Sequence, residues 1–282
     1  MKYVIGIDLG TSSVKTLLVG QDGEIKGEAS AAYPLIQERP GYSEQNPEEW
    51  VNGTVDCLQR LLQESGVSAA DIEGVSFSGQ MHGLVLLDEQ NNVLRNAILW
   101  NDTRTTKQCR EIEAKLGDRL LEITRNAALE GFTLPKVLWV QEHEPELFAK
   151  AARFVLPKDY LRYRMTGKVQ MEISDAAGTL MLNVPEGKWS DEIAAAFGSG
   201  RLLPAARRQH RGDGDAAAGV CGANRPVPGD EGVRRRRGQR LRRGWRGDRP
   251  QGRRAVQRGN LRRCPNLRRG QKQRLRRQGA FL

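Results

Sequence analysis

The first 200 residues of the chain predict an α/β fold, and three observations lead to that prediction. Runs rich in Val, Ile and Leu are separated by short polar turns. Three such runs follow one another before the first helical pattern begins. The segment also combines 20 Lys and Arg with 29 Asp and Glu residues, which is the mixed usage of a globular domain. We therefore expect a packed domain over residues 1–200.

Three antiparallel strands are predicted at the start of the chain. Residues 3–7 have the apolar character of a buried strand, and residues 10–13 form a tight polar turn. Residues 13–20 form the second apolar run. Residues 21–24, with the sequence Gln-Asp-Gly-Glu, supply hairpin turn chemistry before the third run at residues 25–32. Two hairpins in succession should therefore open the fold.

A helix follows the hairpins. Asn46 has the residue type of a helix N-cap, Pro47 suits the first helical position, and acidic residues occupy the first turn. The apolar residues that follow are spaced as on one helix face: Val51, Val55, Leu58 and Leu62.

The remaining elements complete the predicted order. Strands are expected at residues 72–77, 84–87 and 93–100. Residues 105–154 are mainly helical in pattern, and residues 158–166 form one more helix. Three strands, a helix, a strand and then an inserted region is the order of one lobe of the actin-like, ribonuclease H-like ATPase fold. It differs from the strict alternation of a doubly wound dinucleotide fold.

Residues 201–282 differ sharply in composition. They contain 25 Lys and Arg against 5 Asp and Glu residues, and Arg, Gly, Gln and Pro dominate. So few apolar residues cannot offset the entropy of ordering the backbone. We expect an incomplete N-terminal lobe over residues 1–200, followed by a disordered Arg/Gly-rich tail over residues 201–282.

The cysteines and the N-terminus indicate a cytoplasmic protein. The four cysteines are far apart and have no CxxC spacing, which argues against a zinc site or a disulfide framework: Cys57, Cys109, Cys221 and Cys264. Asp8 comes too early for a signal peptide, and no apolar run approaches the length of a membrane span. Reduced thiols and a cytoplasmic location are expected.

The turn after the first strand has the chemistry of a phosphate site. Asp8 ends the strand, and Gly10, Thr11 and Ser12 follow it. Backbone N–H groups and hydroxyls in such a turn can surround a phosphate while the carboxylate holds a hydrated Mg²⁺. An ordinary hairpin turn can contain the same residues, so this motif alone leaves both interpretations open.

Two more strings accompany this turn, and together the three resemble those of the FGGY carbohydrate kinases. The strings are Ile-Gly-Ile-Asp-Leu-Gly-Thr-Ser-Ser-Val-Lys at residues 5–15, Ser-Gly-Gln-Met-His-Gly at residues 78–83 and Leu-Trp-Asn-Asp-Thr-Arg at residues 99–104. The Gly-Gln-Met-His-Gly string is similar to that of the xylulokinase branch. The resemblance implies the first lobe of a two-lobed sugar kinase, with Asp8 as the Mg²⁺ and phosphate organiser.

The resemblance also implies the residues that contact the sugar. Met81 would form an apolar wall of the pentulose pocket, and the His82 ring would present a nitrogen to a sugar hydroxyl. Trp100 could stack on the sugar or belong to the core. Asp102 could accept hydroxyl donors or pair with Arg104.

The sequence also predicts the positions of a later segment and of a tryptophan. Residues 174–179, Ser-Asp-Ala-Ala-Gly-Thr, resemble a family segment and are expected to help shape the pocket. Trp139 lies in the apolar run at residues 136–139 and is expected in the core.

The activity implied for the intact relative is phosphorylation of D-xylulose by ATP with Mg²⁺, and a homodimer is left open. One alternative is a kinase for another polyol or a sugar acid, such as glycerol, gluconate or ribulose. The second alternative is a basic tail that binds nucleic acid through its charge. The tail has only Trp245 and Phe281 as stacking groups and no regular Arg-Gly-Gly repeat, so specific nucleic-acid binding is not expected.

The catalytic base of the family, an Asp in a Gly-x-Asp-Asn string, is absent, and so is its Gly-Thr-Ser-Gly nucleotide turn. The tail contains 24 Arg and one Lys, as expected for GC-rich DNA translated out of frame. A one-base shift permits Gly-Ala-Asp-Asn from residues 236–240 and Gly-Thr-Ser-Gly from residues 259–263. We therefore expect a frameshift near residues 199–206 and a chain with little or no catalytic activity of its own.

Overall fold

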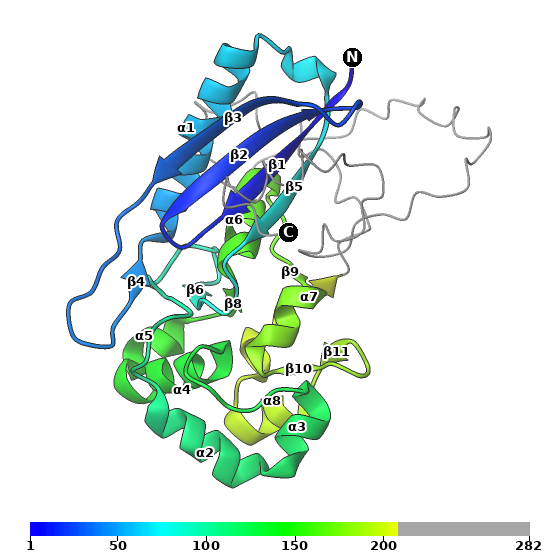
Figure 1. The fold of residues 1–282 in the computed structure, drawn as a ribbon. Coiled ribbons are helices and arrows are strands. Elements are labelled where there is room, and N and C mark those ends of the chain that lie inside the picture. Colours follow the sequence, from blue (N-terminus) through cyan, green and yellow to red (C-terminus); the bar gives the residue numbers. More distant parts are fainter. Residues whose placement is uncertain (208–282) are drawn as a thin grey trace. The chain divides into compact units, whose positions relative to one another are not determined.

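A computed structural model describes residues 1–207, and its first part is a four-stranded sheet (Figure 1). The strand order is β3-β2-β1-β5, with β2 antiparallel to both neighbours and β5 parallel to β1. The bounds are Tyr3–Leu9 for β1, Ser13–Gly20 for β2, Ile25–Ala32 for β3 and Ile72–Gly79 for β5. The three predicted antiparallel strands and the later strand at β5 are confirmed, and the structure adds that β5 is parallel to β1.

Helix α1 (Pro47–Ser65) begins where the sequence predicts. The Asn46 side chain accepts a hydrogen bond from the Glu48 N–H, which satisfies one of the free donors of the first turn. The helix ends at Gly66, whose φ of 66° is readily adopted by glycine. The predicted cap and proline are therefore both in place.

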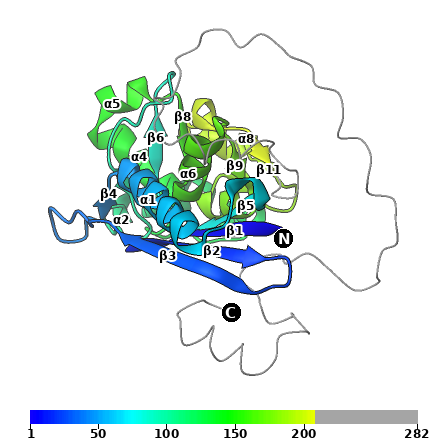
Figure 2. The same cartoon turned by 90° about the horizontal axis from the view of Figure 1, so that it is seen from above.

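Two helices cover one face of the sheet (Figure 2). Side chains alternate along β2, so every second residue points into a core shared with α1 and α6 (Pro157–Thr166). Buried members of this first core are Ile5, Ile7, Leu9, Val14, Leu18, Trp50, Leu61, Tyr160 and Leu161. Each such side chain contributes about 1.5–3 kcal/mol by leaving water, so the core holds β1 rigidly beneath the turn that follows it.

The second part is mainly helical and encloses its own core. Its helices are α2 (Thr106–Leu116), α3 (Asp118–Thr124), α4 (Thr133–His143), α5 (Pro145–Lys150), α7 (Ile173–Ala176) and α8 (Asp191–Phe197). Among the described residues, 3-10 turns lie at Ala69–Asp71, directly before β5, and at Ala177–Thr179 and Gly200–Leu202 in this second part. Trp139 is buried in this second core, as expected.

Short strand pairs lie outside the main sheet. Three of these pairs are antiparallel: β4 (Glu44–Gln45) with β7 (Ala97–Ile98), β6 (Val85–Leu87) with β8 (Arg153–Val155), and β10 (Leu182–Asn183) with β11 (Lys188–Trp189). The fourth pair, β9 (Met171–Glu172) with β12 (Ala206–Arg207), is parallel. Neighbouring residues of β6 face different cores: Leu86 faces the second, and Val85 and Leu87 face the first. This strand is therefore a wall common to both cores.

The structure differs from the predicted elements at residues 93–100 and 105–154. The strand expected at residues 93–100 is formed only at Ala97–Ile98. The helical region at residues 105–154 is interrupted at Gly117 and Arg125, which have φ of 49° and 58°, and it gives way to β8 at Arg153. Among the described residues, no helix is long and apolar enough to cross a membrane.

Cys57 and Cys109 are buried free thiols. Cys221, Cys264 and the tail predicted at residues 201–282 fall outside the described residues, apart from residues 201–207.

Candidate functional site

The turn between β1 and β2 is held by its own backbone and by a tyrosine. The Gly10 N–H donates to the Ser13 carbonyl at 3.0 Å, and the Tyr33 hydroxyl donates to the Gly10 carbonyl. A Cβ at position 10 would lie 3.0 Å from that Ser13 oxygen, so glycine suits the tight turn. Ser12 is exposed beside it. The turn is thus preformed, with an unobstructed serine at its tip.

Thr11 is fixed from two sides. Its carbonyl accepts a hydrogen bond from Gln45 Nε2 at 2.7 Å, and its hydroxyl oxygen accepts one from Trp100 Nε1 at 2.9 Å. Because the indole is only a donor, the Thr11 hydroxyl keeps its own hydrogen for another acceptor. Trp100 is 46% exposed, so it is not a core residue.

Gln45, which no sequence motif indicated, joins this turn to the one after β5. Its Oε1 accepts from Trp50 Nε1 at 3.0 Å and from Gln80 Nε2 at 3.2 Å. The Gln80 N–H also donates to the Leu9 carbonyl at 2.7 Å. The indole donor fixes the orientation of the Gln45 amide, and this buried amide ties the two turns together.

His82 lies on the second turn in a left-handed backbone conformation, with φ of 65°. Its Nδ1 is 2.7 Å from the Gly178 carbonyl oxygen, and its ring meets the Phe132 ring edge-on at 4.9 Å between centroids. The His82 carbonyl accepts from the Thr133 hydroxyl at 3.0 Å. Met81, one residue earlier, is 36% exposed. Of the two predicted sugar contacts, the His82 ring is thus held by contacts within the protein, and the Met81 side chain is partly exposed to solvent.

The segment at residues 174–179 packs against His82. Gly178 lies in the 3-10 turn after α7, and a Cβ there would lie 2.3 Å from His82 Cε1, so no larger residue fits. Lys158 holds the start of α7 through an ion pair of 2.7 Å with Asp175 and one of 3.3 Å with Glu172. Pro157, at the start of α6, packs against Gly83. A Cβ built at position 83 would lie 2.7 Å from the Pro157 Cγ atom.

Asp102 pairs with Arg104, which is the second of the two roles that the sequence left open for it. Its carboxylate is completely buried and accepts from Arg104 Nε at 2.9 Å, Arg104 Nη2 at 2.7 Å and the Ser43 N–H at 2.7 Å. The Arg104 guanidinium in turn lies 3.6 Å from the Tyr42 ring centroid. Both carboxylate oxygens are therefore engaged within the protein, which favours pairing with Arg104 over contact with a sugar.

Asp8 lies opposite Lys15 on β2 and Ser78 on β5. Partial burial raises the pKa of Asp8, while the Ser78 hydrogen bond and the Lys15 charge act in the opposite direction. Among residues 1–207 there is no cluster of three metal-binding side chains. A single carboxylate beside hydroxyls still fits Mg²⁺, which commonly takes one or two carboxylates together with phosphate oxygens and water.

Lys136 is a buried cation near this site that the sequence did not single out. Its Nζ donates to the carbonyls of Glu130, Gly131 and Phe132 at 2.9, 2.7 and 2.7 Å. Burial lowers its pKa to about 7. The three bonds fix the loop that carries Phe132 against His82. In the sequence, this lysine was a single charge in an apolar helix start, which does not reveal such a role.

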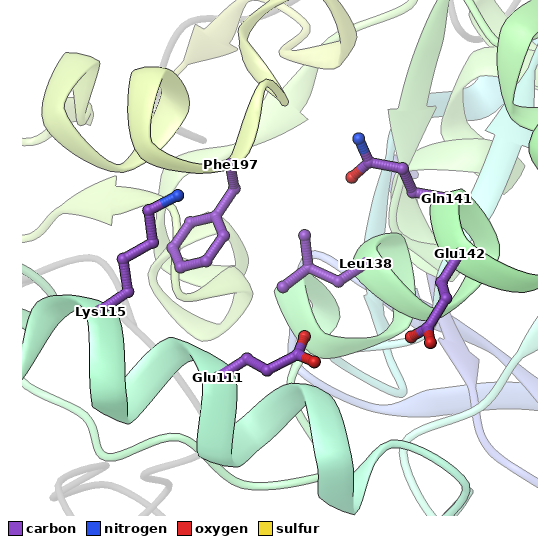
Figure 3. A pocket seen from close by; sticks show the side chains of 6 residues that line it. All are labelled: Glu111, Lys115, Leu138, Gln141, Glu142 and Phe197. Atoms are coloured by element: carbon purple, nitrogen blue, oxygen red, sulfur yellow. The ribbon is translucent and has the colours of Figure 1, made fainter.

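A separate cavity of about 350 Å³ lies between α2 and α4 (Figure 3). It is lined by Glu111, Lys115, Leu138, Gln141, Glu142 and Phe197. None of the predicted site residues contributes to it, and its charged side chains are at least partly exposed. It therefore belongs to a different part of the surface from the two turns.

Comparison with known proteins gives a family match over most of the chain. The N-terminal domain of the FGGY family of carbohydrate kinases matches residues 3–225. A xylulose kinase of Bacillus subtilis (strain 168) is 64% identical over 198 residues, which cover 70% of this chain and 40% of that protein. The chain thus spans about two fifths of the length of the curated relatives it matches.

Solved structures of sugar kinases also align with this chain. A "xyloylose kinase" from Brucella ovis aligns with a TM-score of 0.70 and 37% identity, covering 73% of this chain and 43% of that one. A gluconate kinase from Lactobacillus acidophilus aligns with a TM-score of 0.69 and 27% identity, covering 73% and 42%.

Proposed function

Because this chain belongs to the FGGY family of carbohydrate kinases, we propose that it is the sugar-binding lobe of a kinase that transfers phosphate from ATP to D-xylulose. One observation carries the proposal at the level of the site. The turn at Gly10–Ser12 and the turn at Gln80–His82 follow the same ends of parallel strands, and Gln45 bonds to both. A phosphate site and a sugar site are expected to be adjacent in a phosphotransferase.

The residues of the first turn suit a phosphate carried with Mg²⁺. The Thr11 hydroxyl keeps a hydrogen to donate, and Ser12 is exposed beside it. Asp8 would hold the hydrated cation, which when bound neutralises charge on the transferring phosphoryl group. In our proposal, Asp8, Thr11 and Ser12 position the phosphate, and Asp8 is not the base.

Transfer joins a sugar hydroxyl oxygen to the terminal phosphorus and releases ADP, while the hydroxyl proton passes to a base. The family supplies that base in a Gly-x-Asp-Asn string, which is absent from this sequence. We therefore propose that residues 1–200 form the lobe, that residues 201–282 arose by a frameshift, and that this chain alone is inactive. Reading the coding DNA tests the frameshift, because the shifted frame should continue the kinase without an early stop.

The relatives named xylulose kinases support D-xylulose, whereas the gluconate kinase keeps a sugar acid as the alternative. The intact kinase would act in the cytoplasm, where the free thiols of Cys57 and Cys109 remain reduced. A homodimer of that kinase also remains a proposal.

The experiment compares this chain with a frame-restored chain in a coupled ADP-release assay. The substrates are D-xylulose, D-ribulose, glycerol and D-gluconate, each with Mg²⁺ and ATP. The restored chain should turn over D-xylulose best, and the 282-residue chain should give no signal above background. Normal turnover by the 282-residue chain would refute its proposed inactivity, and a preference for gluconate would refute the substrate.

A further inference from the structure

Three backbone carbonyls surround the ammonium of Lys136, which is completely buried. Its Nζ donates to the carbonyl oxygens of Glu130, Gly131 and Phe132 at 2.9, 2.7 and 2.7 Å, and the three carbonyls belong to one loop, residues 130–132. An ammonium has three hydrogens to donate, whereas a neutral amine has two. All three bonds can therefore form only while Nζ keeps its proton.

This loop supports one residue on each side of the proposed site. The Phe132 ring meets the His82 ring edge-on at 4.9 Å between centroids. Gly131 packs against the Trp100 backbone, since a Cβ at position 131 would lie 3.2 Å from the Trp100 carbonyl oxygen. Trp100 Nε1 in turn donates to the Thr11 hydroxyl at 2.9 Å. One ammonium thus holds a loop that reaches both turns.

We infer that Lys136 is a positioning residue of the proposed site, and that gain or loss of its ammonium proton changes how the loop holds His82 and Trp100. The inference rests on the proposed function. It adds to that function a dependence on protonation, exerted by a fully buried side chain.

Burial makes the proton on Lys136 easy to lose, because it lowers the pKa of this lysine to about 7. Three neighbouring groups oppose the shift with negative charge, and one positive charge adds to it: Asp102, Cys109 and Glu130 oppose it, and Arg104 adds to it. The His82 ring also faces the ammonium. Burial lowers the pKa of His82, the Gly178 bond and the Asp175 charge oppose this shift, and the lysine charge adds to it.

The neighbours that oppose the shift are each engaged elsewhere or uncharged. Asp102 Oδ2 pairs with Arg104 Nη2 at 2.7 Å. Burial raises the pKa of Cys109 to about 11, so its thiol on α2 is neutral. Glu130 Oε1 accepts from the Thr106 hydroxyl at 2.9 Å. The ammonium therefore depends on the three carbonyls of the loop for its stabilisation, and the loop depends on the ammonium.

Loss of this proton acts on the loop rather than on the fold as a whole. The ordinary pKa of a lysine is 10.5, so between pH 7 and 10.5 the unfolded chain holds a proton that the folded chain has released. The contribution of Lys136 to the free energy of unfolding therefore rises with pH in this range. The loop can lose one of its three hydrogen bonds while the domain stays folded.

NMR on the 282-residue chain, labelled with ¹³C at lysine Cε, tests the titration directly. The Cε signal of each lysine reports the protonation of its own Nζ. Ordinary lysines titrate at about 10.4, so a lysine signal that titrates near pH 7 identifies Lys136 even if Lys136→Met fails to fold. If no lysine signal titrates between pH 6 and 9, the inference is overturned.

Two side chains report whether the loop follows this proton. The Trp100 indole N–H signal, identified with Trp100→Phe, and the His82 ring signals, identified with His82→Asn, should shift with the midpoint of the lysine. The Trp189 indole, which donates to the Pro204 carbonyl at 2.6 Å, should not shift. Asn tolerates the left-handed backbone, so His82→Asn should keep the Trp100 shift. Its loss there would assign the shift to the histidine and overturn the inference.

Matched variants test the cause. Lys136→Met should abolish the Trp100 shift, whereas Lys107→Met, at an exposed lysine, should retain it. Gly131→Ala should displace the Trp100 signal at every pH, and Gly74→Ala, where nothing lies within 4 Å of the new Cβ, should not. A Trp100 shift that survives in folded Lys136→Met would contradict the role of the ammonium.

Titration with D-xylulose tests the consequence for the site. The dissociation constant of the wild-type chain should rise about fivefold between pH 6.5 and 8.5, the effect of one lost hydrogen bond, and that of Lys136→Met should not change with pH. A wild-type constant that does not depend on pH would overturn the positioning role while leaving the kinase proposal intact. If the sugar binds at no pH, the proposed function fails for this chain, and the lysine and indole signals still decide whether the proton controls the loop.

Discussion

Lys136 shows how one buried side chain can organise a loop. Its ammonium serves three successive carbonyls, and removing it would leave those acceptors buried without donors. We expect Lys136→Met to lower the free energy of unfolding by about 2–4 kcal/mol, measured by urea denaturation. Lys107→Met is the matched control, because Lys107 is 62% exposed in a surface ion pair with Glu142. An equal loss in both variants would show that the carbonyl bonds are not the cause.

Asp159 should make stability depend on pH. Its carboxyl is fully buried with Oδ2 unpartnered, and burial raises its pKa to about 7, while Lys158 and Arg162 oppose the shift and Asp175 adds to it. Between pH 4 and 7 the folded state keeps a proton that the unfolded state has released. The stabilisation from this group is therefore complete below pH 4 and is lost as pH rises through 7. The difference in unfolding free energy between wild type and Asp159→Asn should follow that course, and a flat difference would contradict it.

At the residue scale, the sequence could single out side chains that belong to a recognisable local motif. Thr11 and His82 follow strands within recognisable motifs, and the structure brings their turns together. The hydrogen bonds of Gln45 and Lys136, and the contact of Gly178 with His82 within the segment at residues 174–179, could not be predicted, because each forms only after folding. Gly178 and His82, for example, are 96 positions apart.

At the scale of elements, the two turns behave as one unit because β4 supplies Gln45 between them. The variant Gln45→Met keeps the length of the side chain but leaves the Thr11 carbonyl and the Trp50 and Gln80 N–H groups without their partner. We expect a loss of about 1–3 kcal/mol and faster hydrogen exchange at the Trp50 indole. Gln63→Met, at an exposed position on α1, is the control and should change neither. Slow exchange at Trp50 in Gln45→Met would show that the network does not depend on Gln45.

Helices and strands with a regular hydrophobic periodicity or a capping residue could be predicted from the sequence, and very short strands could not. Asn46 and Pro47 mark the start of α1 because capping is a local interaction. Strand β8 has three residues, too few for a pattern, and exists because β6 pairs with it. Short strands of this kind are selected by tertiary pairing rather than by local propensity.

At the scale of the whole described domain, strand β6 contributes residues to both cores, and this predicts that the two cores unfold together. Leu86 belongs to the second core, while its neighbours Val85 and Leu87 belong to the first, so neither core can open without disturbing β6. Leu86→Ala should cost about 2–5 kcal/mol. It should also lower the urea midpoint equally at the indole signals of Trp50 and Trp139, one in each core. A midpoint that moves only at Trp139 would mean that the cores unfold separately.

The sheet order has a further consequence for synthesis on the ribosome. The strands that carry the first turn are complete once residue 79 has emerged, whereas Gly178 emerges 96 residues after His82. Because N-terminal segments can begin to fold during synthesis, we expect a nascent chain to form the turn between β1 and β2 while its histidine ring is still unrestrained. Stalled chains ending before and after the α7 segment should differ in the His82 signal, and the growing polypeptide would thus acquire the two halves of its site at different times.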